Sequence, residues 1–189
     1  GTSNGAFTTF QSSIGRITPA GVLSGFLGNV SLPSGITAGP DGNMWFTNFD
    51  LESVGRITPT GVVTSFAGTG ISGPFGITAG PDGNLWFTNL SNNSIGRITP
   101  AGVVTNYTSP SINGPYGITA GPDGNLWFTN QYGSSIGRIT PGGAVSSFTG
   151  WGTKYPYGVN YPSSIVVGPD GNLWFTNAGG NNGNGSIGR

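Results

Sequence analysis

Residues 35–48 occur in four copies along the chain, and this internal repeat decides which folds are possible. The first copy reads Gly-Ile-Thr-Ala-Gly-Pro-Asp-Gly-Asn-Met-Trp-Phe-Thr-Asn, and related copies occupy residues 76–89, 117–130 and 164–177. The tryptophans of successive copies are separated by 41, 41 and 47 residues. Repeats of this length indicate a stacked or radial array of one supersecondary unit.

Each repeat unit has the pattern of four short β-strands. In one unit, segments 77–79, 85–88, 94–99 and 103–107 are rich in β-branched and aromatic residues, as strands are. The turn sequences Gly-Pro-Asp-Gly-Asn and Pro-Ala-Gly follow the first and third segments. No segment has the apolar spacing of a helix. A unit of 41 residues with four antiparallel strands is typical of a β-propeller blade.

We therefore predict an all-β fold, a β-propeller of four-stranded antiparallel blades, with about four and a half blades in this chain. We expect a single domain that covers residues 1–189. The predicted blade repeats lie near residues 5–34, 35–75, 76–116, 117–163 and 164–189.

The two ends of the chain are out of phase with the blades. Residues 5–9 resemble a degenerate second strand, and the chain ends inside a blade at Arg189. Second and third strands therefore occur at both ends, one set too many for simple closure of four blades. Either missing blades complete a larger ring, or two chains associate as a homodimer. The last copy stops after Ser-Ile-Gly-Arg, where the other copies continue with Ile-Thr-Pro, and this favours a partial chain.

The composition excludes several classes of function. Six Lys or Arg residues balance six Asp or Glu residues, so the chain lacks the basic surplus that nucleic acids and anionic membranes attract. The absence of His and Cys excludes a Ser-His-Asp triad, a cysteine nucleophile, disulfides and an ordinary zinc site. No apolar run approaches the roughly 18–20 residues that span a bilayer. We expect no nucleic-acid partner, no membrane insertion, no cofactor and no metal site.

The repeat accounts for most of the ionisable residues. Four of the six acids are Asp41, Asp82, Asp123 and Asp170, which lie in the predicted turns. Five of the six basic residues are the repeat arginines Arg16, Arg56, Arg97, Arg138 and Arg189. We expect each Asp to accept backbone N–H bonds in its turn and each Arg to make a repeated polar contact within or between blades. Only Asp50, Glu52 and Lys154 fall outside this pattern.

The variable loops are predicted to share one face of the ring. Because strands alternate in direction, the second-to-third loops and the blade crossovers lie on the face opposite the invariant turns. This face includes an aromatic insertion within residues 149–163, and exposed aromatic rings with polar tips suit carbohydrate stacking or protein contact. The candidate ligand-binding residues are Trp151, Lys154, Tyr155, Tyr157, Tyr161, Phe75, Tyr116, Asn48, Asn89, Asn130 and Asn177.

Each group of candidates also has a structural alternative. The aromatic residues of the insertion would instead plug the central opening or cover an adjacent blade. Phe75 and Tyr116 would belong to the core, and the four asparagines would simply close a turn.

The repeat resembles that of a known enzyme family. Gly-Pro-Asp-Gly-Asn-Leu-Trp-Phe-Thr-Asn followed by Ser-Ile-Gly-Arg-Ile-Thr-Pro-x-Gly is similar to the repeat of the virginiamycin B lyases (streptogramin lyases), which are related to the NHL repeat proteins. The resemblance implies a seven-bladed ring. It also implies Mg-assisted elimination that opens a cyclic depsipeptide antibiotic, with histidines and a glutamate on the loop-rich face.

The residues implied by this resemblance are replaced here. The family often has His before the first strand, and these positions are Ser34, Phe75, Tyr116 and Ser163. The family often has Glu after Trp-Phe-Thr, and all four copies here have Asn. Elimination requires a base, and an asparagine amide is not one. Asp50 and Glu52 are the only nearby carboxylates, so we identify no catalytic residue in this stretch.

Three functions follow as hypotheses. The leading one is a non-catalytic binding module, extracellular or at the cell surface, that recognises a glycan or protein through its aromatic loop face. The second is a fragment of a virginiamycin B lyase-like enzyme. The third is a self-associating propeller scaffold in which end blades pair between chains.

Overall fold

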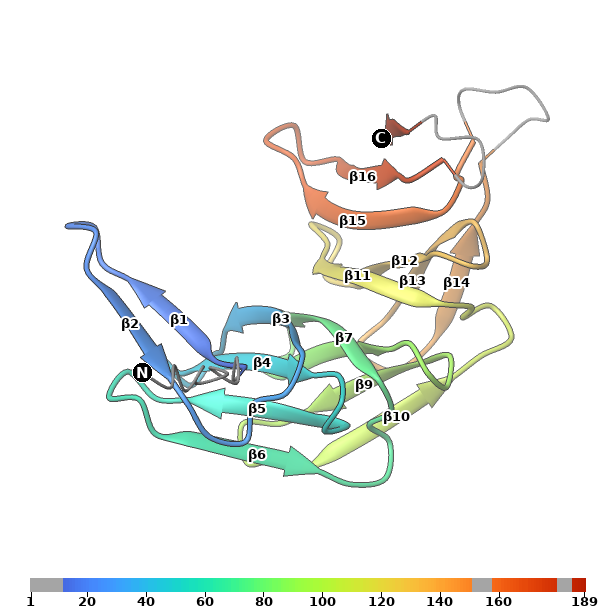
Figure 1. Cartoon of the computed structure of the whole chain (residues 1–189). Coiled ribbons are helices and arrows are strands. Elements are labelled where there is room, and N and C mark those ends of the chain that lie inside the picture. The colour runs from blue at the N-terminus through green and yellow to red at the C-terminus, as the bar shows by residue number, and fades with distance from the viewer. Residues whose placement is uncertain (1–11, 151–157, 180–184) are drawn as a thin grey trace, which may run out of the picture.

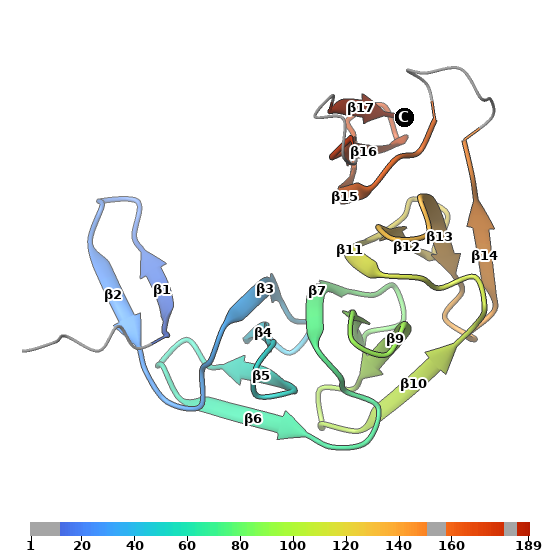
Figure 2. The same ribbon diagram turned by 45° about the vertical axis from the view of Figure 1, so that its right-hand side comes forward.

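The computed structural model describes residues 12–150, 158–179 and 185–189. Over these residues the chain forms strands and turns, and the strands gather into antiparallel sheets that follow one another along an open arc (Figures 1 and 2). This confirms the predicted all-β fold with four-stranded blades. None of the described segments is a helix of the length and apolar character needed to cross a membrane.

Three blades are complete. The first consists of β3 (Pro33–Ala38), β4 (Met44–Asn48), β5 (Ser53–Ile57) and β6 (Val63–Ala67). The second consists of β7 (Pro74–Ala79), β8 (Leu85–Asn89), β9 (Ser94–Ile98) and β10 (Val104–Thr108). The third consists of β11 (Pro115–Ala120), β12 (Leu126–Asn130), β13 (Ser135–Ile139) and β14 (Val145–Phe148). In each of them the strands pair in sequence order.

Incomplete units lie at both ends of the arc. A hairpin of β1 (Ile14–Ile17) and β2 (Leu23–Phe26) precedes the first blade. A three-stranded sheet follows the third blade and consists of β15 (Pro162–Val167), β16 (Leu173–Asn177) and β17 (Ser186–Gly188). The degenerate second strand predicted at residues 5–9 lies outside the described residues.

The first strand of each complete blade begins earlier than the sequence predicted. In the second blade it starts at Pro74 rather than at residue 77, and its pairing register shifts between Pro74 and Ile77. Proline has no N–H to donate to a strand ladder, so it is suited to such an irregular strand start. Figure 2 shows these first strands, β3, β7, β11 and β15, on the inner side of the arc, with β6, β10 and β14 on its outer side.

The apolar cores lie between blades. The core between the first two blades joins Trp45 and Val54 of one blade to Ile77, Leu85, Phe87 and Ile98 of the next. The core between the second and third blades repeats this set as Trp86, Ile95, Ile118, Leu126, Phe128 and Ile139. Each blade therefore places its tryptophan face against the following blade.

Within each sheet, a glycine of the third strand faces a phenylalanine of the second. Gly96 pairs directly with Phe87, and a Cβ atom at Gly96 would overlap the ring of Phe87. The same arrangement joins Gly55 to Phe46 and Gly137 to Phe128. The absence of a side chain at these glycines makes room for the buried ring.

An alanine at Gly96 is expected to destabilise the fold. Gly96→Ala forces a methyl group into the ring of Phe87, and overpacking of this kind lowers the free energy of unfolding by about 1–3 kcal/mol. Gly15 is the matched control, because it occupies the equivalent position in β1 and a Cβ atom there meets nothing within 4 Å. Urea unfolding of both variants checks the prediction, which fails if Gly96→Ala is as stable as Gly15→Ala.

A turn carboxylate, a tryptophan and an arginine form one polar unit in each blade. In the second blade, Asp82 accepts hydrogen bonds from the indole N–H of Trp86 at 3.0 Å and from the side chain of Asn84 at 2.8 Å. Its carboxylate lies 3.7 Å from the guanidinium of Arg97. It also accepts the backbone N–H of Asn84, as the sequence predicted.

The arginine of this unit also links neighbouring blades. Arg97 lies over the rings of Trp86 and Tyr107, with its central carbon 5.7 and 5.8 Å from their centroids. It donates a hydrogen bond of 3.5 Å to the carbonyl of Pro141 in the next blade. The equivalent bond from Arg56 to Pro100 measures 3.1 Å. The predicted arginine contact is therefore made both within and between blades.

These contacts lower the pKa values of the turn carboxylates. Burial alone raises the pKa of Asp82, but the hydrogen bonds from Trp86 and Asn84 outweigh burial and lower it below 3.8. For Asp170 the bonds from Trp174 and Asn172 lower the pKa to about 2. A carboxyl whose pKa is lower in the folded state than in the unfolded state stabilises the fold at higher pH. That stabilisation is lost as the pH falls through the folded-state value.

Replacement of Asp82 is expected to have a pH-dependent cost. Asp82→Asn removes the charge that the indole and guanidinium groups contact, and it lowers the free energy of unfolding near neutral pH by about 1–3 kcal/mol. The difference from wild type should shrink as the pH falls below 3.8, because the carboxyl of Asp82 then takes up a proton first in the unfolded state and, at lower pH, in the folded state. Urea unfolding across this range measures it. Asp50→Asn, outside the unit, serves as the control, and a difference that is constant with pH contradicts the assignment.

Candidate functional site: the loop-rich face

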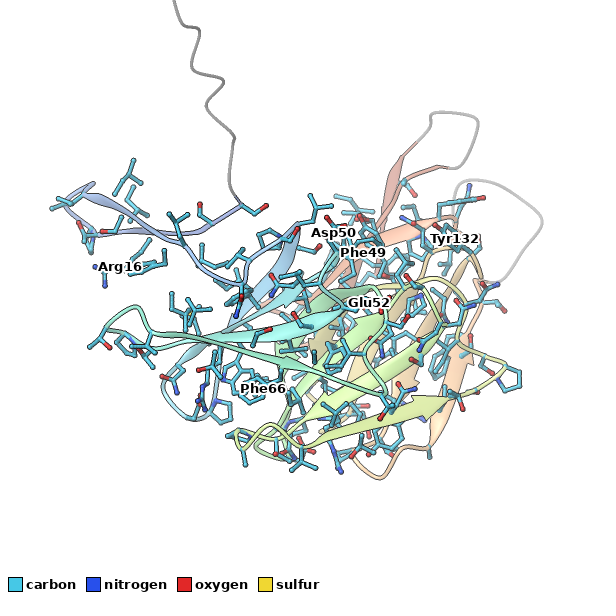
Figure 3. All side chains as sticks on the ribbon, turned by 60° about the horizontal axis from the view of Figure 1, so that its bottom comes forward. Arg16, Phe49, Asp50, Glu52, Phe66 and Tyr132 are labelled. Carbon is cyan, nitrogen blue, oxygen red and sulfur yellow. The ribbon has the colours of Figure 1, made fainter. Side chains whose placement is uncertain are left out.

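The second-to-third turns and the blade crossovers lie together on one face, as the sequence predicted. The backbone N–H of Leu90, which follows β8, donates to the carbonyl of Gly73 in the crossover at 3.0 Å. The corresponding bond from Gln131 to Gly114 measures 2.8 Å. Figure 3 labels four side chains from these turns, Phe49, Asp50, Glu52 and Tyr132, all distant from Arg16 of the β1–β2 hairpin.

One residue of each crossover has a left-handed backbone conformation. It precedes the proline that opens the first strand, and its φ is 42° at Leu32, 53° at Gly73, 62° at Gly114 and 46° at Tyr161. Glycine adopts this conformation without strain, whereas leucine and tyrosine rarely do. The side chains of Leu32 and Tyr161 are exposed, so both strained positions place an apolar or aromatic group on the loop-rich face.

The preceding blade contributes to this arrangement. The N–H of Tyr161 donates to Ser134 Oγ at 3.4 Å, and the N–H of Gly114 donates to Asn93 Oδ1 at 2.7 Å. A Cβ atom at Gly114 would lie 2.5 Å from the ring of Tyr132. The exposed ring of Tyr132 therefore packs across a glycine that leaves room for it.

Phe75 and Tyr116 stack on one another across adjacent blades. Their ring centroids are 3.9 Å apart with an interplanar angle of 31°, and Phe49 meets Phe75 edge-on at 6.5 Å. Phe75 and Tyr116 are both half-buried. A rim position and a core position were both predicted as possible for these two residues, and they lie near the start of β7 and of β11.

Threonines of the second strands hold these aromatic residues in position. Thr88 Oγ1 accepts the N–H of Gly76 at 2.8 Å and donates to the carbonyl of Tyr116 in the next blade at 2.8 Å. Thr47 makes the equivalent bond to the carbonyl of Phe75 at 2.6 Å. A Cβ atom at Gly76 would lie 2.5 Å from the Tyr116 carbonyl oxygen, so glycine is required for this close approach.

The four asparagines after Trp-Phe-Thr serve the crossovers. The amide nitrogen of Asn89 donates to the carbonyl of Gly70 at 2.9 Å and to Ser94 Oγ at 3.0 Å, while its oxygen accepts the N–H of Ser72 at 3.0 Å. The same bonds recur at Asn48, Asn130 and Asn177. All four are buried. These bonds satisfy the side-chain amides within the crossovers, as in the turn-closing role that the sequence offered as one of two alternatives.

The remaining candidates belong to the aromatic insertion. Trp151, Lys154, Tyr155 and Tyr157 lie outside the described residues, so only Tyr161 of this group is placed. Phe49, Leu32 and Tyr132 were missed by the sequence analysis. Phe49 and Tyr132 occupy turns whose sequence differs between repeats, and that divergence was the available signal.

The loop-rich face has few charged groups. Asp50 and Glu52 belong to the β4–β5 turn, and Asp50 accepts a hydrogen bond from Ser31 Oγ at 3.2 Å. The four carboxyls with lowered pKa are in the first-to-second turns, on the opposite face. No group of three or more carboxylate, His or Cys side chains able to hold a metal ion occurs among the described residues. The described residues therefore do not fit the magnesium site that the family resemblance implies.

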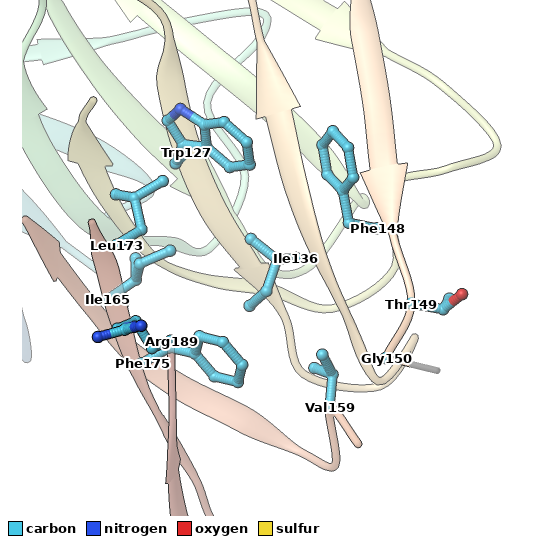
Figure 4. A pocket seen from close by; sticks show the side chains of 10 residues that line it. All are labelled: Trp127, Ile136, Phe148, Thr149, Gly150, Val159, Ile165, Leu173, Phe175 and Arg189. Carbon is cyan, nitrogen blue, oxygen red and sulfur yellow. The ribbon is translucent and has the colours of Figure 1, made fainter. Parts of the chain in front are cut away.

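An apolar cavity of about 260 Å³ lies between the third blade and the C-terminal sheet (Figure 4). Trp127, Ile136 and Leu173 line it in the places that Trp86, Ile95 and Leu126 occupy one interface earlier. In that earlier interface Ile139 and Val145 complete the packing. The cavity is thus an inter-blade core that the described residues fill only in part, and the sequence analysis did not predict it.

Comparison with known proteins agrees with the repeat and the fold. A family model described as the virginiamycin B lyase family matches residues 6–111 and 67–189. A solved streptogramin B lyase is 35% identical, with a TM-score of 0.80 over 93% of this chain and 61% of the other. A virginiamycin B lyase from Staphylococcus aureus is 39% identical, with a TM-score of 0.81 over 93% of this chain and 62% of the other. No curated protein matches the chain.

More distant structures share only the fold. One chain of a nidogen/laminin complex is 18% identical with a TM-score of 0.69. The chain described here spans 61–62% of the length of the similar lyases. Since the family model covers nearly all of its residues, the chain belongs to the virginiamycin B lyase family.

Proposed function

We propose that this chain is a non-catalytic binding module that recognises a glycan or protein through its loop-rich face, outside the cell or at the cell surface. The observation that carries the proposal is the stacked pair Phe75 and Tyr116, which is held across two blades by threonine hydrogen bonds. Pre-positioned aromatic rings lose little conformational freedom when a ligand covers them. Such rings contribute much of the binding energy at many recognition surfaces.

The wider face supports the same proposal. Leu32, Tyr132 and Tyr161 are exposed on it, and the left-handed conformations at Leu32 and Tyr161 hold apolar groups outward at a cost in strain. Tyrosine combines a flat apolar ring with a hydroxyl, which suits both sugar rings and protein side chains.

The positions that correspond to the family's acidic and basic groups argue against catalysis by the described residues. Phe75 and Tyr116 stand where histidine is expected, and neither side chain has the imidazole nitrogen that lets histidine act as a general base. Asn89 stands where glutamate is expected, and its amide is bonded to Gly70, Ser72 and Ser94. A general base must reach the proton that it removes, and these groups do not provide one.

A second candidate is lyase activity, favoured by the family assignment. One similar structure is a catalytically inactive virginiamycin B lyase from Staphylococcus aureus with quinupristin, 38% identical to this chain. On this reading the 189-residue chain is a fragment of a longer enzyme, with Asp50 or Glu52 as its nearest source of a base on the loop-rich face.

The binding proposal predicts that replacing aromatic side chains on this face by alanine lowers the affinity for the ligand. Glycan-array screening identifies the ligand, and titration then compares Tyr116→Ala and Tyr132→Ala with wild type. Each change is expected to weaken binding by about tenfold, because a central aromatic contact contributes more than about 1 kcal/mol. Val103→Ala is the control, since Val103 is exposed on the opposite face. Binding that is indifferent to both tyrosine changes contradicts the proposal, and Trp151→Ala extends the comparison to the insertion.

The lyase alternative predicts turnover. If it holds, the chain opens the ring of quinupristin in the presence of Mg²⁺, EDTA abolishes the reaction, and Asp50→Asn or Glu52→Gln reduces it. Mass spectrometry of the product distinguishes ring opening from binding alone. We expect binding without ring opening from this chain, so turnover by the wild type overturns the non-catalytic proposal.

A further inference from the structure

Three of the four crossovers on the loop-rich face are joined to the preceding unit by the same hydrogen bond. The donor is the backbone N–H of the residue that precedes the proline of the first strand. The acceptor is the side chain just before the serine that leads into the third strand of the preceding unit. The bonds join Leu32 to Ser12 Oγ at 3.3 Å, Gly114 to Asn93 Oδ1 at 2.7 Å and Tyr161 to Ser134 Oγ at 3.4 Å.

The crossover between the first and second blades lacks this bond. Gly73 is the equivalent donor and is buried. Glu52 occupies the position of the acceptor, but none of the described residues accepts the Gly73 N–H. Buried backbone N–H groups are almost always paired, with protein or with a bound molecule. The Gly73 N–H is therefore a donor that a bound group can use.

The carboxylate of Glu52 is also without a polar partner among the described residues. The aspartates of the four first-to-second turns each lie within 4.0 Å of an arginine, and Asp50 accepts a hydrogen bond from Ser31 Oγ. Glu52 is exposed. Its φ of 43° is close to the 54° of Asn93 and the 44° of Ser134, so its side chain begins from the same turn geometry.

Aromatic rings lie beside this donor and this acceptor. Phe49 belongs to the same turn as Glu52, and its carbonyl accepts the N–H of Glu52 at 3.3 Å (Figure 3). Phe75 follows Gly73 by two residues, and Phe49 meets its ring edge-on at 6.5 Å. The stacked partner of Phe75 is Tyr116. We call the Gly73 N–H, the Glu52 carboxylate and the Phe75 ring the hydroxyl site.

We propose that the hydroxyl site binds a neutral sugar, an inference that rests on the binding function proposed above. A hydroxyl group both accepts and donates, so one sugar hydroxyl accepts the Gly73 N–H and donates to the Glu52 carboxylate. The C–H face of the same ring then covers Phe75. A sugar combines a hydroxyl edge and an apolar face on one rigid ring, and this combination favours a glycan over a protein as the ligand.

The charges of the β4–β5 turn define the class of sugar. Asp50 and Glu52 are both acidic, so a sugar with its own carboxylate is repelled, because like charges placed together oppose binding. A neutral hydroxyl is attracted instead, since a hydrogen bond to an ionised acceptor is about twice as strong as one between neutral groups.

The test converts position 52 into the residue found in the next blade. Glu52→Asn supplies the acceptor that Asn93 supplies to Gly114, and asparagine adopts a left-handed conformation more readily than glutamate. We expect this variant to resist urea better than wild type. We also expect it to bind sugar about tenfold more weakly, because it removes the carboxylate and occupies the Gly73 N–H. A gain in stability with a loss of binding excludes unfolding as the cause.

The probes are the methyl glycosides of glucose, galactose, mannose and N-acetylglucosamine, titrated by NMR. Wild type should bind at least one of them, and should bind the methyl glycoside of glucuronic acid more weakly than that of glucose. A deoxy analogue that lacks the bonded hydroxyl should lose about tenfold in affinity for wild type but not for Glu52→Asn. Leu51→Asn, at the neighbouring exposed position, is the matched control and should bind as wild type does.

Three outcomes overturn the inference. They are a wild type that binds none of these neutral glycosides, a Glu52→Asn variant that binds them as wild type does, and a Glu52→Asn variant that is less stable than wild type. In each case the Gly73 N–H is left to water only. If Tyr116→Ala still weakens a glycan or protein ligand, the proposed binding function stands and the hydroxyl site alone is wrong. If the chain binds neither glycan nor protein, the proposed function fails as well.

Discussion

Apolar packing between neighbouring blades is the interaction on which this structure depends. A single repeat unit cannot bury its hydrophobic face alone, so stacking on a neighbour creates the core. Trp45 and Trp86 are fully buried because the following blade covers them, whereas Ile36 and Met44 of the first blade are exposed toward the two-stranded hairpin. The same sequence position is thus interior or surface according to how much of the neighbouring unit is present.

The polar groups of the repeat serve this packing and leave little for chemistry. Each turn aspartate accepts the indole N–H of its tryptophan, which satisfies the one polar atom of a ring that otherwise lies in an apolar core. The arginine then lies over that ring and reaches the next blade. Most ionisable groups of the repeat are therefore structural.

The fold was predictable from sequence because its signals are local and repeated. The tryptophan, the turn residues and the strand composition recur in each copy of the repeat. An ambiguous strand or turn in one copy can therefore be assigned from the other copies. The strand boundaries were less predictable. β7 starts early, at Pro74, through an irregular pairing that strand composition does not reveal.

The candidate site was only partly predictable, because its geometry depends on distances between blades. The sequence identified Phe75 and Tyr116 but gave no reason for their rings to stack, which follows from the close approach of Gly76 to the Tyr116 carbonyl. It also left the role of Asn89 open, since a buried asparagine and an exposed one look alike until their hydrogen bonds are known.

The left-handed position before each first strand has a consequence for how such a surface can vary. Leucine, glycine, glycine and tyrosine occupy it in successive units at φ values from 42° to 62°. The peptide path is therefore nearly the same whether the side chain is absent, aliphatic or aromatic. Each blade therefore has one position at which the side chain can be replaced while the backbone keeps its conformation. Substitutions at these positions can change the surface of a propeller one blade at a time.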